Sequence, residues 1–301
     1  MSHASTPTVL VVGEAITAFM SYPGEQRLSF HGPFPSGAPV IFASAAARLG
    51  AHVELAAGVG DDAFGRQLHD QLAQHGVSTS LMTIDPSRPT ATTFVTYHDD
   101  GSRDFLFYVE GTAARAAPPD VLDRLAAAPD WLHISGSALA FGGTTAETAW
   151  RAFVRANEWG TPVSLDPNVR KEVLHEGLQD RFQALLEGAA VVFASEGELE
   201  ALGRPESVVT DRGAVLVRKN GANGAVVSTS SGSTRVAAPV VSEVDPDGAG
   251  DIFAAGYVVA TLLGHPPEAA ARVGCVVAAE SVEVRGPLES DVGHASTYVG
   301  R

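Results

Sequence analysis

Cysteine is almost absent from this sequence, in which Cys275 is the only one among 301 residues. A single cysteine cannot form a disulfide within the chain. Residues 1–7 also lack the basic and apolar regions of a signal peptide, and no apolar run reaches the roughly 18 residues that a membrane-spanning helix needs. These absences predict a cytoplasmic protein without a membrane span.

Basic residues are scarce as well. The sequence has 20 Lys+Arg against 35 Asp+Glu, for a formal net charge of −15. A charge of this sign repels polyanions and argues against a nucleic-acid partner. It does not exclude a phosphate-bearing ligand, because backbone N–H groups can hold phosphates locally.

The apolar pattern predicts strands that alternate with helices along most of the chain. The β-branched run over 8–13 is typical of a central parallel strand that is buried on both faces. Further strands are expected over 52–60, 131–135, 163–166, 191–194, 214–218 and 224–228. Helices are expected over 39–49, 62–75, 145–159, 178–187, 196–202, 250–263 and 267–281. Repeated strand–helix units predict a single α/β domain over 1–301, with a mostly parallel sheet flanked by helices.

Two stretches, about 14–35 and 90–111, interrupt this alternation of strands and helices. The second alternates apolar and polar residues on both sides of Asp99-Asp100-Gly101-Ser102, a pattern typical of an antiparallel hairpin. Ligands bind at the carboxyl ends of the strands in parallel sheets, so we expect these stretches to form a small β-sheet lid over that edge. An isolated hairpin is only marginally stable, which favours a homodimer formed through the lid, with surface packing as an equal alternative.

The most informative segment is Asp245-Pro246-Asp247-Gly248-Ala249-Gly250-Asp251, which precedes an apolar helix. N–H groups at the start of a helix lack internal partners, and the helix dipole adds partial positive charge. Small residues at 248–250 would let a transferring phosphoryl group approach those N–H groups, and Asp251 could take a proton from an attacking hydroxyl. The same short pattern also fits a helix start that an acidic residue merely stabilises.

This segment is similar to the second signature of the ribokinase-like (PfkB-type) carbohydrate kinases. Ser36-Gly37-Ala38-Pro39, followed by Ala43, Gly50 and residues 60–65, resembles their first signature. The resemblance extends from Val9 to about Ser290 and is strongest toward fructokinases and 2-keto-3-deoxygluconate kinases. It implies a ribokinase-like α/β fold with a β lid, and ATP-dependent phosphorylation of a primary hydroxyl of a small sugar or sugar acid. ATP and Mg²⁺ are the implied cofactors, and a monovalent cation near Asp245 is left open.

The resemblance also implies roles for individual residues. Asp251 is expected to be the catalytic base, and Glu198 to organise Mg²⁺ through water. The expected anion hole consists of Gly248, Ala249 and Gly250. The expected acceptor-binding residues are Gly37, Ala38, Tyr108, Asp166, Asn168 and Arg170. The expected nucleotide-binding residues are Ser195, Lys219, Gly221, Gly224 and Cys275.

The sequence departs from the family pattern where sugars are recognised. The Asn that binds sugar hydroxyls is replaced by Ile41, the early substrate Asp of fructokinases by Ala18, and the Arg after the hairpin Tyr by Val109. Without that Asn and Arg, binding of a usual ketose or sugar acid should be weaker. The acceptor therefore stays open.

Two other functions compete with a sugar kinase. One is a nucleoside kinase of the same fold. The other is a non-catalytic regulator that binds a sugar or nucleotide, which Ile41 and Val109 favour and which the retained Asp251 and Glu198 argue against. A dinucleotide-dependent dehydrogenase is disfavoured, because no Gly-x-Gly-x-x-Gly follows the first strand.

Overall fold

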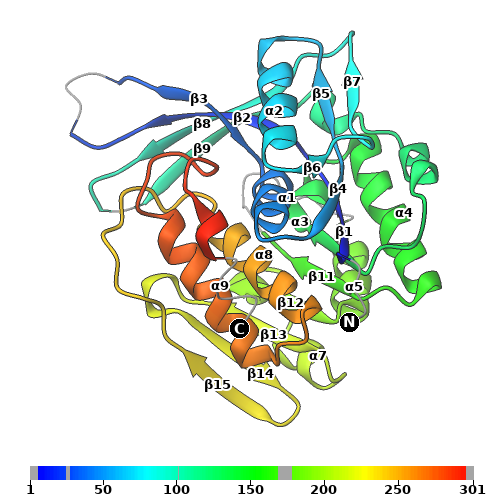
Figure 1. Cartoon of the computed structure of the whole chain (residues 1–301), viewed down its shortest axis with the longest axis vertical. Coiled ribbons are helices and arrows are strands. Elements are labelled where there is room, and N and C mark those ends of the chain that lie inside the picture. The colour runs from blue at the N-terminus through cyan, green and yellow to red at the C-terminus, as the bar shows by residue number, and fades with distance from the viewer. Residues whose placement is uncertain (1–5, 25–27, 101, 169–177, 296–301) are drawn as a thin grey trace.

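The structure, a computed structural model, describes residues 6–24, 28–100, 102–168 and 178–295. A nine-stranded sheet forms its centre, with the strand order β15-β14-β13-β12-β11-β10-β1-β4-β6 (Figure 1). The strands from β13 to β6 run parallel, and β14 and β15 form an antiparallel edge. The bounds are β1 (Thr8–Val12), β4 (His52–Ala56), β6 (Val77–Ser78), β10 (Trp131–Ser135), β11 (Val163–Asp166), β12 (Val191–Ser195), β13 (Val215–Lys219), β14 (Ala225–Thr229) and β15 (Gly232–Val236).

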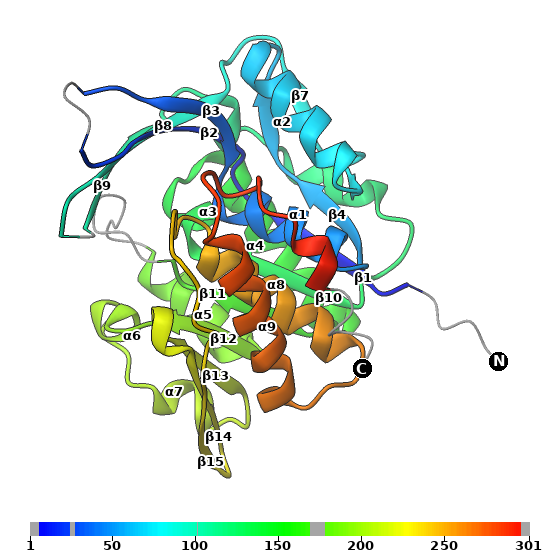
Figure 2. The same cartoon turned by 60° about the vertical axis from the view of Figure 1, so that its left-hand side comes forward.

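Alternate side chains of the central strands enter two separate cores, one on each face of the sheet. In β1, Val9 and Val11 belong to one core, whereas Leu10 and Val12 belong to the other. The first core is covered by α1 (Ala38–Arg48), α2 (Ala63–Gln74), α8 (Ala249–Leu262) and α9 (Pro267–Ser281). The second is covered by α3 (Gly136–Ala140), α4 (Gly143–Trp159), α5 (Gln179–Gly188), α6 (Glu198–Ala201) and α7 (Ser207–Thr210). Burial on both faces explains the uninterrupted apolar runs. Helices lie on both sides of the central sheet in Figure 2, which confirms the predicted α/β class.

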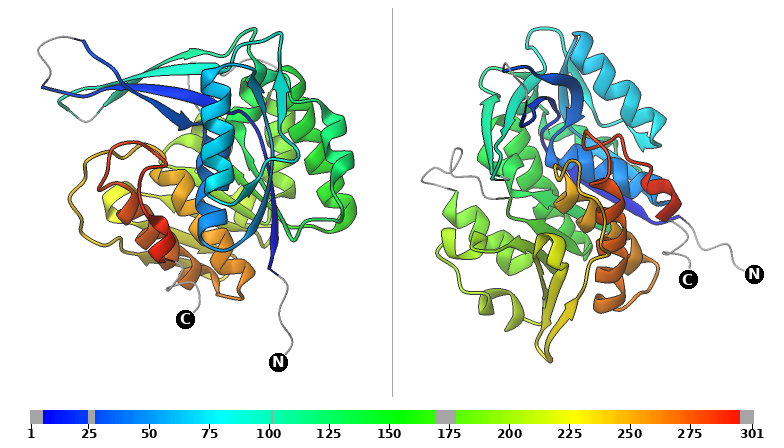
Figure 3. Two further views of the ribbon diagram at one scale, coloured as in Figure 1. Left: turned by 45° about the horizontal axis from the view of Figure 1, so that its top comes forward. Right: turned by 90° about the vertical axis from the view of Figure 1, so that its left-hand side faces the viewer.

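A separate four-stranded sheet, which we call the lid, has the order β3-β2-β8-β9. Strand β2 (Ile16–Ser21) runs parallel to β8 (Ala91–Tyr97), and β3 (His31–Ser36) and β9 (Arg103–Tyr108) flank them in antiparallel orientation. The pairing of Thr92 with Tyr108 and of Tyr97 with Arg103 confirms the predicted hairpin. In Figure 3 the lid projects from the side of the molecule near the loop that leads into α8.

The structure differs from the prediction mainly in short or polar elements. The strand expected over 52–60 is divided into β4 and β5 (Gly58–Gly60), and β5 pairs with β7 (Thr83–Asp85) outside the main sheet. At Gly58, the first residue of β5, a Cβ would lie 2.1 Å from the carbonyl oxygen of Ala113, so only glycine fits there. Strand β15 was not predicted, because its side chains are largely exposed and show no apolar pattern. In the described part of the chain, no helix has the length and apolar character needed to cross a membrane.

Candidate active site

Two adjoining cavities lie at the carboxyl ends of the parallel strands. The first, of about 200 Å³, lies between these strand ends and the lid. The second, of about 520 Å³, lies between the turn after β13 and helices α8 and α9. The residues shared by both linings are Arg103, Ser195, Lys219, Pro246 and Gly250. The loop that opens α8 is therefore at the junction of the two cavities.

The turn at this junction is shaped by glycine. Gly248, at the N-cap of α8, has φ 76°, a left-handed conformation that side chains disfavour. A Cβ at Gly250 would lie 3.2 Å from Nζ of Lys219, so the absence of a side chain leaves more space in front of the helix start. The amides of Asp251 and Ile252 donate to the Gly248 carbonyl at 3.0 and 2.9 Å, which places Asp251 in the first turn. An anion can thus approach the helix N-terminus from the cavity.

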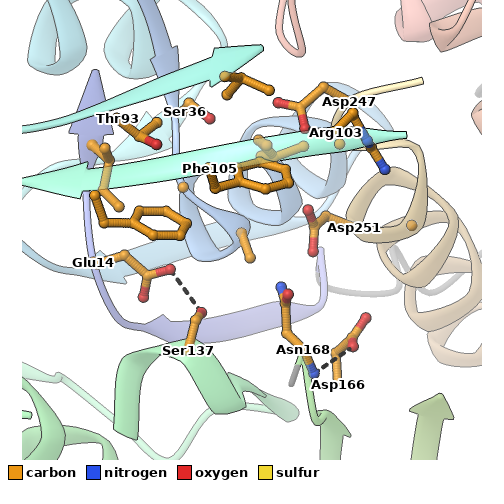
Figure 4. A pocket seen from close by; sticks show the side chains of 18 of the residues that line it. Glu14, Ser36, Thr93, Arg103, Phe105, Ser137, Asp166, Asn168, Asp247 and Asp251 are labelled. Carbon is orange, nitrogen blue, oxygen red and sulfur yellow. Dashed lines mark hydrogen bonds and ion pairs between the residues drawn. The ribbon is translucent and has the colours of Figure 1, made fainter. Parts of the chain in front are cut away.

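Asp251 points into the first cavity. Figure 4 shows its carboxylate between Phe105 of the lid and Asn168, which follows β11. The backbone of Asn168 is left-handed, with φ 43°, and its amide donates to Oδ1 of Asp166 at 3.2 Å. This local turn brings the Asn168 side chain to the same wall of the cavity as Asp166. A hydroxyl bound in this cavity can therefore face Asp251.

Lys219 places its ammonium group among acidic residues of the junction. Nζ of Lys219 lies 2.5 Å from Oδ2 of Asp166, whose side chain is 1% exposed. Burial alone would lower the pKa of Lys219, but the charges of Asp166, Glu198 and Asp251 outweigh burial and raise that pKa above its ordinary value. Oε2 of Glu198 accepts a hydrogen bond from the Ser195 amide at 2.6 Å. A positive charge therefore stands at the junction of the two cavities, under the electrostatic influence of three carboxylates.

The first cavity has a polar wall and an apolar wall. On the polar wall, Glu14 is buried and its Oε1 accepts a hydrogen bond of 2.7 Å from Ser137 (Figure 4). Thr93, in β8 of the lid, also lines this cavity. Its hydroxyl is buried without a hydrogen-bond partner among the described residues, so it is available to a ligand. The apolar lining consists of Ile16, Ile41, Val95, Phe105, Phe107 and Phe141. Such a cavity suits a small acceptor that has both hydroxyl groups and an apolar face.

Most of the residues predicted from the sequence meet at these two cavities. The first cavity is lined by Gly37, Ala38, Asp166, Asn168, Ser195, Glu198, Lys219, Gly248, Gly250 and Asp251. The second is lined by Ser195, Lys219, Gly221, Gly224, Ala249, Gly250 and Cys275. Arg170 lies outside the described residues.

The assignment of Tyr108 to acceptor binding is corrected by the structure. Side chains alternate between the two faces of β9, so Phe105 and Phe107 face the cavity while Leu106 and Tyr108 face away from it. Tyr108 is 55% exposed and packs edge-on against Phe94 on the outer face of the lid.

Several lining residues were missed by the sequence-based prediction. Phe105 and Phe107 could have been found from the period of two in β9, and Glu14 from its place directly after a buried strand. The same alternation places Arg103 on the face of Phe105 and Phe107, but it does not indicate what Arg103 contacts. Its guanidinium contacts Asp247, a residue 144 positions away in sequence, at 3.4 Å. Only the packing of the lid on the loop before α8 brings these two together.

Sequence comparison identifies relatives over most of the chain. Residues 7–292 match the model of the pfkB family carbohydrate kinases. A fructokinase from Vibrio alginolyticus is 35% identical over 243 residues, which cover 77% of each chain. A 2-dehydro-3-deoxygluconokinase from Thermoproteus tenax is 32% identical over 269 residues, which cover 85% of this chain and 81% of the relative.

Solved structures show the same architecture. A putative ribokinase II from E. coli in complex with ATP and Mg²⁺ superimposes with a TM-score of 0.84 at 29% identity, covering 98% of this chain and 99% of that one. A Vibrio cholerae fructokinase with bound fructose, ADP and calcium gives 0.83 at 27% identity, covering 96% of each chain. A double mutant of that fructokinase with bound fructose, ADP and potassium gives 0.82 at 27% identity, covering 95% of this chain and 96% of the mutant.

The match extends over nearly the whole length, and the glycine turn, Asp251 and the two adjoining cavities occur together in one ribokinase-like fold. The chain therefore belongs to the pfkB family of carbohydrate kinases.

Proposed function

We propose that this protein transfers the γ-phosphoryl group of ATP to a primary hydroxyl of a small sugar or sugar acid, fructose-like or 2-keto-3-deoxygluconate-like. The main support for this proposal is the position of Asp251 and the glycine turn at the junction of the first cavity, which is small and partly polar, with the larger second cavity. The first cavity would hold the acceptor and the second the nucleotide. In-line transfer needs this arrangement, because the attacking and leaving oxygens must lie on opposite sides of the phosphorus.

In the proposed reaction, Asp251 accepts the proton of the acceptor hydroxyl as its oxygen bonds to the γ-phosphorus. The bond between that phosphorus and the β–γ bridging oxygen breaks, and ADP leaves. The amides at the start of α8 hold the charge on the transferring group, and Lys219 adds a positive charge at the junction. The products are a phosphorylated acceptor and ADP, with the proton on Asp251.

The acidic residues of the junction fit a nucleotide-bound Mg²⁺. No group of three or more His, Cys, Asp or Glu side chains that could hold a metal occurs among the residues that the structure describes. This fits Mg²⁺ better than a protein-caged metal, since Mg²⁺ keeps several waters and binds through one or two carboxylates and substrate phosphates. Glu198 would hold it through water, and the metal would neutralise charge on the ATP phosphates.

The lid offers the surface for the proposed homodimer. Its outer face carries Phe30, Leu106 and Tyr108, which are 38%, 54% and 55% exposed. A second copy that packs on this face would cover these side chains and support a sheet that is small on its own. A cytoplasmic location would supply the ATP that this reaction needs.

The acceptor is tested with a coupled assay of ADP release across ketoses, 2-keto-3-deoxy acids and nucleosides. Turnover with a ketose or a sugar acid, absent from Asp251→Asn, is the expected result. Turnover with nucleosides alone would replace the sugar kinase by a nucleoside kinase. Nucleotide binding without turnover on any acceptor would favour the non-catalytic regulator that Ile41 and Val109 suggested.

A further inference from the structure

The buried carboxylate of Asp245, three residues before Gly248, is saturated with hydrogen bonds. Asp245 is 2% exposed. Its Oδ1 accepts from the Tyr97 hydroxyl at 2.6 Å and from the Asp247 amide at 3.1 Å. Its Oδ2 accepts from the Tyr22 hydroxyl at 2.8 Å and from the Gly286 amide at 2.9 Å. A carboxylate has about four acceptor sites, and protein donors fill as many here.

Two of these four donors belong to the lid. Tyr97 ends β8, and Tyr22 follows the neighbouring end of β2. Their rings stack with centroids 5.1 Å apart, and the guanidinium of Arg285 lies 4.5 Å from the centre of the Tyr22 ring. Burial, reinforced by the charges of Asp245 and Asp247, raises the pKa of both hydroxyls well above the ordinary tyrosine value. Both therefore stay protonated and donate at any physiological pH.

A third lid residue reaches the same loop. The guanidinium of Arg103 pairs with Asp247, whose side chain is only 11% exposed (Figure 4). Asp247 directly precedes Gly248, the N-cap of the catalytic helix. The lid thus holds the loop at Asp245 and at Asp247, immediately before the amides of the anion hole.

This arrangement does not fit a cation on the Asp245 carboxylate. A monovalent cation near Asp245 was left open by the sequence, and potassium is bound in the Vibrio cholerae fructokinase mutant. An ion on this carboxylate would need lone pairs that the two tyrosines now occupy. Displacing those hydroxyls would leave two buried donors without partners, and the cost of each unpaired donor would offset the stabilisation that the ion supplies.

We propose that Tyr22 and Tyr97 take the place of a monovalent cation at Asp245 and tie the lid to the catalytic turn. They are positioning residues, because they act on the anion hole through Asp245. The Tm and the turnover rate should then not depend on potassium. The anion hole should be fully formed only when the lid contacts the loop at Asp245 and Asp247. The effect on turnover rests on the proposed kinase function, whereas the effect on stability does not.

The first experiment measures thermal unfolding without nucleotide, in potassium chloride and in tetramethylammonium chloride at equal ionic strength. The wild type is expected to have the same Tm in both salts. Tyr22→Phe/Tyr97→Phe keeps the rings but frees two acceptor sites on a buried carboxylate, so its Tm should fall in tetramethylammonium and recover partly in potassium. Tyr108→Phe, on the outer face of the same lid, is the matched control and should show no salt-specific change.

A potassium-specific rise in the Tm of the wild type would overturn the proposal, as would a double variant with the same Tm in both salts. If the double variant fails to fold, Tyr97→Phe alone is subject to the same comparison. These outcomes are decided without any kinase assay, so they stand even if the proposed function fails.

The second experiment separates positioning from substrate binding. Loosening the catalytic turn should lower kcat roughly tenfold or more in the double variant while KM for ATP changes little, because the nucleotide cavity does not include either tyrosine. Potassium should restore part of that kcat in the double variant and leave the wild type unchanged. An unaltered kcat in a folded double variant would overturn the positioning role.

Discussion

Lys219 and Asp166 form an ion pair at the point where the two cavities of the active site meet, with Nζ 2.5 Å from Oδ2. Asp166 ends β11 and Lys219 ends β13, two strands separated in the sheet by β12 alone. The same ammonium group lies beside Gly250, in the turn that we propose as the anion hole. The pair therefore holds a positive charge at the junction where we propose that the phosphoryl group is transferred, at the cost of desolvating two ions.

Removing Lys219 should affect stability and catalysis separately. Lys219→Met leaves the buried Asp166 carboxylate without its partner, so we expect a loss of about 3 kcal/mol in the free energy of unfolding, measured by urea denaturation. Lys219→Met/Asp166→Asn removes the unpaired charge and should recover most of that stability. Neither variant should recover kcat, which we expect to fall roughly a hundredfold. Near-wild-type turnover in the double variant would show that the charge at the junction is dispensable.

Asp251→Asn should abolish turnover without weakening ATP binding. The amide is nearly isosteric with the carboxylate but cannot accept the hydroxyl proton, and a general base contributes roughly 10²–10⁴-fold to the rate. Calorimetric titration with a nonhydrolysable ATP analogue should give a Kd within error of the wild type. Full activity in this variant would remove Asp251 from its assigned role.

The two faces of β9 provide a matched pair of substitutions. Phe105→Ala enlarges the first cavity, where we propose that the acceptor binds, and should raise KM for the acceptor with KM for ATP unchanged. Leu106→Ala, on the outer face, should leave both KM values unchanged and weaken self-association, measured by sedimentation velocity. The reverse result, with acceptor KM sensitive only to Leu106, would show that the outer face contacts the acceptor.

The sequence predicted those parts of the fold and site that depend on local patterns. Buried strands such as β1 and β11 show continuous apolar runs, and Gly248 to Asp251 carry the chemistry of a helix start within one short segment. The lining from Gly37 to Lys219 could be assigned because the resemblance extends along the chain. Tyr108 was assigned from the family resemblance. The period of two in β9 separates Tyr108 from Phe105 and Phe107, but which of the two faces points inward depends on how the lid packs on the core.

Long-range polar contacts could not be predicted in this way. Asp245 and Tyr22 are 223 positions apart, and Arg103 and Asp247 are 144 apart, so no spacing in the sequence indicates that they meet. These contacts depend on how the lid sits on the core. The position of the lid on the core is determined by many packing contacts together rather than by any one sequence motif.

His133 should make stability fall in mildly acidic solution. It is buried in the core, stacked on Phe42 with ring centroids 3.7 Å apart, and its Nδ1 lies 2.9 Å from the Ser164 hydroxyl. Burial, together with the charge of Lys219, lowers its pKa from 6.5 to about 3. Between those two values the unfolded chain binds a proton that the folded chain does not, so the destabilisation begins below pH 6.5 and is complete near pH 3.

Lowering the pH from 7.5 to 5 should therefore cost about 2 kcal/mol of unfolding free energy through His133 alone. His133→Asn keeps a polar group near Ser164 and cannot take up a proton, so the difference between its stabilities at the two pH values should be smaller by about that amount. His98→Asn, at an exposed site in the lid, controls for general effects of removing a histidine. Urea denaturation of the three proteins at both pH values measures these differences, and an equal loss in wild type and His133→Asn would show that acid sensitivity arises elsewhere.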